Sequence, residues 1–142
     1  MTQVPPTRWD SIRALLSPSG FVLPEDPDPL GTVVSLGERR VGVWIMPDNQ
    51  NHGKLEDFLG FLIPANDPCW GYAQDAAKEA SRLGASFPEV DFIKARIFTW
   101  LAWQREPGLP FGTAISAALF SHEQELAQAF VNWMQRLYIQ AT

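Results

Sequence analysis

The first half of the chain passes from helical to strand-like hydrophobic spacing. Residues 7–17 open with a Thr-x-x-Asp helix start and continue with apolar residues at helical spacing, which predicts a helix. Residues 20–30 hold three prolines among acidic residues, a pattern typical of an extended loop. Residues 32–36 and 41–46 are apolar or β-branched runs, and Gly37 between them predicts a hairpin turn.

The second half predicts helices. Apolar residues over 55–63 form one stripe at helical spacing, which Pro64 ends. Two further helices are expected over 70–83 and 88–104, and the second of these is apolar on nearly all sides. Two capping patterns follow, and they predict a short helix from Thr113 to Phe120 and a C-terminal helix after Ser121, with Phe130, Trp133 and Leu137 on its core face.

This pattern predicts a helix-rich α/β fold with five or six helices and a small sheet that includes the hairpin. With 142 residues and no internal repeat, we expect one domain, 1–142, with strands over 31–46 and a helical part over 54–142. Two strands alone are marginally stable in water. The hairpin therefore needs helices on at least one face, or strands supplied from elsewhere.

Composition narrows the classes of function. The net charge of -5 argues against a standalone nucleic-acid binder, although an acidic nuclease can meet DNA through metal ions. Six Trp and nine Phe either build a dense core or leave an apolar surface for a partner. The single cysteine excludes an intramolecular disulfide and a multi-cysteine zinc site. With neither an apolar run of about 18 residues nor a secretory leader pattern, we expect no membrane association and a cytoplasmic location.

The stretch V-G-V-W-I-M-P-D-N-Q-N-H-G-K-L-E-D-F-L, residues 41–59, concentrates the candidate chemistry. Asp48 and Asn49 follow a strand, and Glu56 lies on the border of the next helix's apolar stripe, so their oxygens could serve magnesium or manganese. Asp57 points to the solvent side on the same helical wheel. The alternative is structural, because acids in a first helical turn cap the helix and Pro-Asp-Asn is common turn chemistry.

Other chemistry-bearing residues carry weaker signals. Lys94, at the edge of its helix's apolar face, could contact a phosphate or extend to water. His52 and His122 have no second ligand at helical spacing, which argues against zinc. Cys69 fits a buried structural cysteine better than an activated thiolate. The Asp-Pro-Asp of residues 26–28 lies in a proline loop rather than after a strand, so we do not interpret it as a metal motif.

Two long motifs and a short one carry a resemblance. V-G-V-W-I-M-P-D-N-x-x-x-G-x-L-E-D-F-L, K-A-R-I-F-T-W-L-A-W-Q-x-x-P-G-x-P-x-G-x-A-I and a terminal F-V-x-W resemble an uncharacterised bacterial family with a TOPRIM-like domain. That family is similar to the OLD-type nucleases, some of which act in phage defence. TOPRIM enzymes use magnesium in phosphodiester chemistry, with a glutamate-glycine turn and a paired-aspartate motif. Neither motif is recognisable here.

The resemblance implies that this chain is the later, C-terminal part of the family's domain. The carried-over site residues are then Asp48, Asn49 and Glu56 as metal ligands, with Glu56 and Lys94 as catalytic groups. Magnesium or manganese would bind only with the missing half supplied by a second copy or another polypeptide. Three hypotheses stay open: part of a TOPRIM-like nuclease that is not catalytic alone, a non-catalytic interaction module that uses its aromatic helices, and a small single-metal phosphodiesterase.

Overall fold

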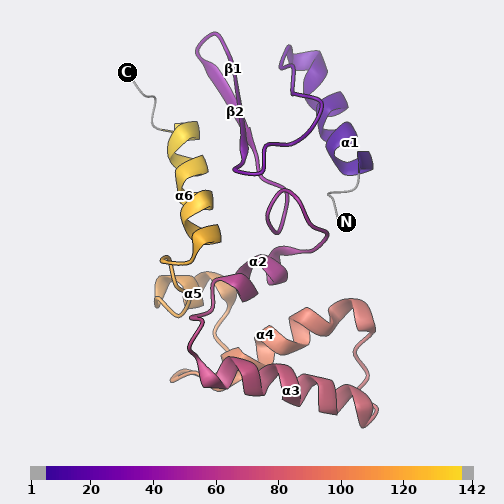
Figure 1. The fold of residues 1–142 in the computed structure, drawn as a ribbon, viewed down its shortest axis with the longest axis vertical. Coiled ribbons are helices and arrows are strands. Elements are labelled where there is room, and N and C mark those ends of the chain that lie inside the picture. Colours follow the sequence, from indigo (N-terminus) through magenta and orange to yellow (C-terminus); the bar gives the residue numbers. More distant parts are fainter. Residues whose placement is uncertain (1–5, 139–142) are drawn as a thin grey trace. The chain divides into compact units, whose positions relative to one another are not determined.

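The computed structural model describes residues 6–138. Its α-helices and strands are α1 (Pro6–Leu16), β1 (Thr32–Leu36), β2 (Arg39–Val43), α2 (Leu55–Phe61), α3 (Pro68–Arg82), α4 (Phe92–Ala102), α5 (Phe111–Ser116) and α6 (Glu125–Tyr138), as drawn in Figure 1. The chain forms two compact units, and the division falls within α2. We call residues 6–58 with 125–138 the hairpin unit, and residues 59–124 the helical unit.

The sheet of the hairpin unit consists of β1 and β2 in antiparallel register. Val34 pairs with Val41 and Val33 with Gly42, and the turn between the strands holds Gly37 at a φ of 61°. Directly opposed residues of an antiparallel pair share a face of the sheet. Val34 and Val41 therefore lie on one face, and Val33 and Gly42 lie on the other.

One face of the hairpin packs against α1. Trp9 of this helix is buried with Leu23 and Ile45, and the valines of that sheet face pack against this cluster. The Trp9 indole N–H donates to the Pro24 carbonyl at 3.1 Å, so the proline loop is tied to the helix. The apolar face of α1 thus supplies the cover that a two-stranded sheet requires.

The opposite face packs against α6. A Cβ placed on Gly42 would lie 2.7 Å from the Leu137 side chain and 3.0 Å from the Trp133 ring, so only glycine lets the helix approach this closely. The Trp133 indole N–H donates to the Thr32 carbonyl at 3.0 Å. Arg40 donates to the Arg136 carbonyl at 2.7 Å. The sheet is therefore covered by a helix on each face (Figure 1).

The helical unit is built on the packing of α3 against α4. Asp67 caps α3 by accepting from the backbone N–H groups of Cys69 and Trp70, and its other oxygen accepts from the Trp100 indole at 3.0 Å. Trp100, with 1% of its surface exposed, lies in the core of this unit with Ile97 and Leu101. One side chain thus both starts α3 and holds α4 beside it.

The helix-rich α/β prediction is confirmed, and β1 and the start of α2 lie where the sequence indicated. The second strand, expected over 41–46, instead spans Arg39–Val43, because Arg39 and Arg40 pair with Leu36 and Ser35. Three further local predictions are wrong. The helix expected from Thr113 begins at Phe111, after Pro110 as N-cap. The C-terminal helix begins at Glu125, and Ser121 Oγ instead accepts from the Glu123 N–H. Cys69, expected to be buried, is exposed in the first turn of α3.

No helix among residues 6–138 combines the length and the apolar character needed to cross a membrane.

Candidate functional site

The segment after β2 folds into a loop that Asn49 closes. Its backbone N–H donates to the Ile45 carbonyl at 2.8 Å, and its side-chain oxygen accepts from the Ile45 N–H at 2.8 Å. Its amide group donates to the Pro29 carbonyl at 3.4 Å. Asn49 is 3% exposed and has a φ of 66°, a left-handed conformation that asparagine tolerates better than most residues. The predicted metal ligand is thus engaged in closing the loop.

Asp48 caps the next turn of the same loop. One carboxylate oxygen accepts from the N–H groups of Gln50 and Asn51, at 3.1 and 2.8 Å. The other accepts from the Asn51 side-chain amide at 2.7 Å. These are the contacts of an Asx turn, and they engage both oxygens that a cation would use.

The two acidic residues in the first turn of α2, Glu56 and Asp57, make different contacts. Asp57 Oδ2 accepts from the Lys54 N–H at 2.8 Å, which is the contact from the third helical residue back to the N-cap. Asp57 is therefore half-buried against the chain, where the helical wheel placed it in solvent. Glu56 is also half-buried in this first turn and has polar contacts of its own. A Cβ on Gly53 would lie 2.9 Å from Asp57 Oδ2, which explains glycine at this position.

Lys94, the remaining predicted site residue, belongs to the helical unit. It is exposed on α4, and its ammonium lies 4.0 Å from an Asp91 carboxylate oxygen one turn earlier. The structure therefore brings Asp48, Asn49 and Glu56 into one unit and leaves Lys94 in the other.

Metal binding by this set conflicts with the geometry of its donors. Asp48 and Asn49 already use their oxygens within the loop, and a hard cation binds through such oxygens. Within residues 6–138, no three His, Cys, Asp or Glu side chains are grouped so that they could hold a metal ion.

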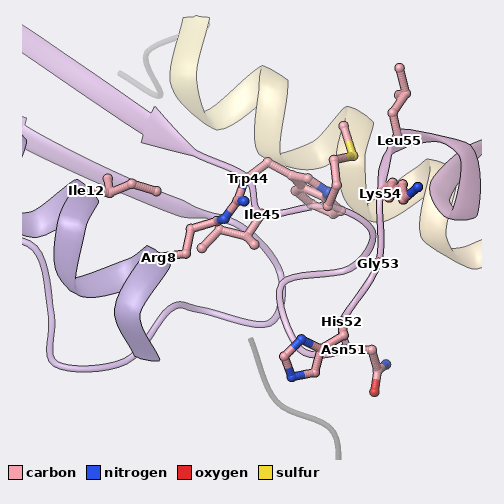
Figure 2. Close-up of a pocket in the computed structure, with 10 residues that line it drawn as sticks. Arg8, Ile12, Trp44, Ile45, Asn51, His52, Gly53, Lys54 and Leu55 are labelled. Carbon is pink, nitrogen blue, oxygen red and sulfur yellow. The ribbon is translucent and has the colours of Figure 1, made fainter. Parts of the chain in front are cut away.

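A pocket of about 500 Å³ lies beside this loop in the hairpin unit. Figure 2 shows Arg8 extending from α1 toward the segment of Trp44 and Ile45, with Asn51, His52 and Lys54 on the loop that follows. Sequence reasoning missed the pocket because Arg8 comes from a helix that precedes the loop by a whole hairpin. The only sequence feature that pointed to this region was the run of polar residues over 48–54.

Comparison with known proteins places the chain in a family without giving it an activity. Neither the search of curated proteins nor the search of solved structures gives a significant match to this chain. A family model matches residues 2–139, which is nearly the whole chain, and its description is a protein of unknown function (DUF3226). The chain that forms this hairpin, loop and pocket is therefore a member of the DUF3226 family.

Proposed function

We propose that this chain is the C-terminal part of a TOPRIM-like, metal-dependent nuclease and does not catalyse alone. The proposal is supported by the packing of helices on both faces of the hairpin: α1 packs on one face and α6 on the other. Within residues 6–138, β1 and β2 pair only with each other. Helices on both faces are typical of larger α/β sheets. We therefore interpret this two-stranded sheet as part of a larger sheet, to which further strands are added.

In this proposal, the metal ligands belong to the polypeptide or domain that supplies the further strands. Since Asp48 and Asn49 hold the loop, the carboxylates for magnesium or manganese would come from a second polypeptide or domain that carries the glutamate-glycine and paired-aspartate motifs. Glu56 and Lys94 are the groups that this chain would contribute to catalysis. Edge strands with unpaired N–H and C=O groups offer the route by which a completing strand joins.

Co-expression with a polypeptide that carries the two missing motifs, taken from a neighbouring reading frame, tests this function. We expect a stable complex that cleaves DNA with Mg²⁺, and no cleavage by either chain alone. Glu56→Gln should reduce cleavage by the complex about 100-fold, the scale of losing a general acid or base. Glu38→Gln, which changes an exposed acid in the hairpin turn, is the matched control and should leave cleavage unchanged.

Two results would contradict the proposal. One is cleavage by the purified chain alone, lost on Asp48→Asn, which would instead identify a small single-metal phosphodiesterase. The other is the absence of both binding and cleavage with a polypeptide that holds the two motifs. Circular dichroism of each variant separates a loss of folding from a loss of activity.

A second candidate, a non-catalytic interaction module, rests on the aromatic surface of the helical unit. Tyr72 and Trp103 stack with ring centroids 5.4 Å apart, and 67% and 42% of their surfaces are exposed. Phe98, which is 46% exposed, stacks on Phe111 at 5.2 Å. Exposed aromatic side chains are enriched at protein interfaces. The occupant we propose for this surface is a second copy of the chain.

Sedimentation velocity over a range of protein concentrations tests the second candidate. We expect reversible self-association that Tyr72→Ser with Phe98→Ser weakens about tenfold or more, because interface aromatics contribute most of the binding energy. Tyr138→Ser, at an exposed tyrosine of the hairpin unit, should leave association unchanged. A chain that stays monomeric at every concentration would rule this candidate out.

A further inference from the structure

The outer edge of β1 carries backbone groups that do not bond to β2. The turn of the hairpin has two residues, so Leu36 and Arg39 on either side of it form the hydrogen-bonded pair nearest the turn. Hydrogen-bonded pairs alternate with non-bonded pairs along an antiparallel ladder, so every second residue of β1 bonds to β2. The N–H and C=O groups of Val33 and Ser35 fall between these bonds and point away from β2.

These outward groups are available to another strand. In the part of the chain that the structure describes, no hydrogen bond from outside the hairpin reaches the backbone of Val33 or Ser35. Ser35 is exposed, and the two covering helices pack on the faces of the sheet. Free N–H and C=O groups on an edge strand bind readily to the backbone of another strand. The outer edge of β1 is therefore a template for strand pairing.

The two edges of the sheet differ in charge. β1 has the sequence T-V-V-S-L and carries no charged residue, whereas β2 begins with Arg39 and Arg40. Arg40 donates to the Arg136 carbonyl at 2.7 Å, and the Arg39 guanidinium lies 5.2 Å from the centre of the Phe21 ring. Charged side chains on an edge strand protect it against pairing. By this criterion β2 is protected and β1 is not.

The positions of the outward groups on β1 suit pairing with a second β1. In an antiparallel pair of two β1 strands centred on Val34, Val33 of each copy lies opposite Ser35 of the other. Each of these pairs exchanges both of its N–H···O=C bonds. The same residues contribute on both sides, so the contact closes as a two-fold dimer. Although each copy carries a net charge of -5, no charged residue lies on the pairing strands.

The helices that cover the sheet also fit such a dimer. Its two-fold axis is perpendicular to the sheet, so both copies of α6 lie on one face and both copies of α1 on the other. α6 contacts both β1 and β2. Adjacent strands are about 4.8 Å apart, so the centres of the two strand pairs are about 10 Å apart. Packed helices are about 8–10 Å apart, so the two α6 helices can lie side by side.

We propose that a second copy of this chain pairs with the outer edge of β1. The product is a four-stranded sheet, made of two hairpins, with helices on both faces. Three strands or more on a covered face give a sheet the stability that a lone hairpin lacks. The proposal does not depend on the nuclease proposal, because it uses neither a metal nor a different polypeptide. It also places the contact in the hairpin unit, whereas the exposed aromatic surface belongs to the helical unit.

Sedimentation velocity and amide hydrogen exchange of the full chain, each over a range of concentrations, test this dimer. We expect a monomer–dimer equilibrium in which the Val33 and Ser35 amides exchange more slowly as the dimer fills. Ser35→Pro removes an N–H that does not bond to β2, and proline is tolerated at such edge positions. It removes two of the intermolecular bonds of the dimer, so dimerisation should weaken about tenfold or more.

Two further variants at the same position separate pairing from folding. Ser35→Thr keeps the N–H and should dimerise like the unmodified chain. Ser35→Lys also keeps the N–H but adds a charge to the edge of each copy, so it should weaken the dimer. Circular dichroism establishes that each variant is folded. If Ser35→Pro does not fold, Ser35→Lys carries the test.

Three results would overturn the proposal. The first is a chain that stays monomeric up to about 1 mM, the weakest affinity of interest. The second is exchange of the Val33 and Ser35 amides at the same rate at every concentration. The third is a folded Ser35→Pro or Ser35→Lys variant that associates like the unmodified chain. The double variant Tyr72→Ser with Phe98→Ser, on the aromatic surface of the helical unit, should leave the protection of the β1 amides unchanged.

Discussion

Replacing Trp133 by alanine is expected to lower the free energy of unfolding of the hairpin unit by about 3–5 kcal/mol, the usual loss for a buried tryptophan. Trp133 is 8% exposed on α6 and donates to the Thr32 carbonyl. It also lies directly over Gly31 and contacts the rings of Trp44 and Phe130. Urea denaturation followed by far-ultraviolet circular dichroism measures the loss.

Two variants separate the contributions to this loss. Trp133→Phe keeps much of the ring packing but leaves the Thr32 carbonyl without its donor, so about 1–3 kcal/mol should be lost. Tyr138→Ala, on the same helix at 72% exposure, should change stability by no more than about 0.5 kcal/mol. Equal stability of Trp133→Ala and Tyr138→Ala would mean that α6 does not hold the hairpin.

The elements with local signals could be predicted from the sequence. β1 spans the residues that its β-branched run indicated, and α2 follows the apolar stripe that ends before Pro64. Trp133 was also expected on the core face of its helix and is buried there. These predictions succeeded because periodicity reflects burial of one face, which continues over many residues.

Helix starts were less predictable, because several polar residues compete for each cap. The Thr113 and Ser121 patterns both failed, whereas Asp67, the residue that does cap α3, was not singled out. A cap requires one favourable contact of a single residue, and its neighbours often offer the same chemistry. The position is then decided by packing, here by the contact of Asp67 with Trp100.

The chemistry of the 41–59 motif could be narrowed from the sequence but not decided. A carboxylate that binds a cation and one that accepts backbone N–H groups use the same oxygens, so composition and spacing fit both roles. Only the contacts of Asp48 distinguish them. The pocket beside the loop depends on Arg8 lying near a segment far along the chain, which no local pattern expresses.

Asn49→Ala should lower the free energy of unfolding of the hairpin unit by about 2–4 kcal/mol. Alanine leaves the buried Ile45 N–H without an acceptor and the Pro29 carbonyl without a donor. It must also hold a φ of 66°, which strains a residue with a Cβ. Thermal unfolding of the variant beside Gln50→Ala, at the exposed neighbour in the same loop, measures the loss without a change in loop length.

Two further measurements identify the role of Asn49: the stability of an Asn49→Gly variant, and the stability of the variants in EDTA and in Mg²⁺. Asn49→Gly removes the same hydrogen bonds but tolerates the left-handed backbone, so it should recover about 1 kcal/mol of the loss seen with alanine. If Asn49 acts by closing the loop, both losses are the same in EDTA and in Mg²⁺. A loss that appears only in Mg²⁺ would instead show that Asn49 binds the metal, because a ligand that binds the folded state stabilises it by mass action. The two roles of one buried amide are thereby distinguished in the isolated chain, without an activity assay.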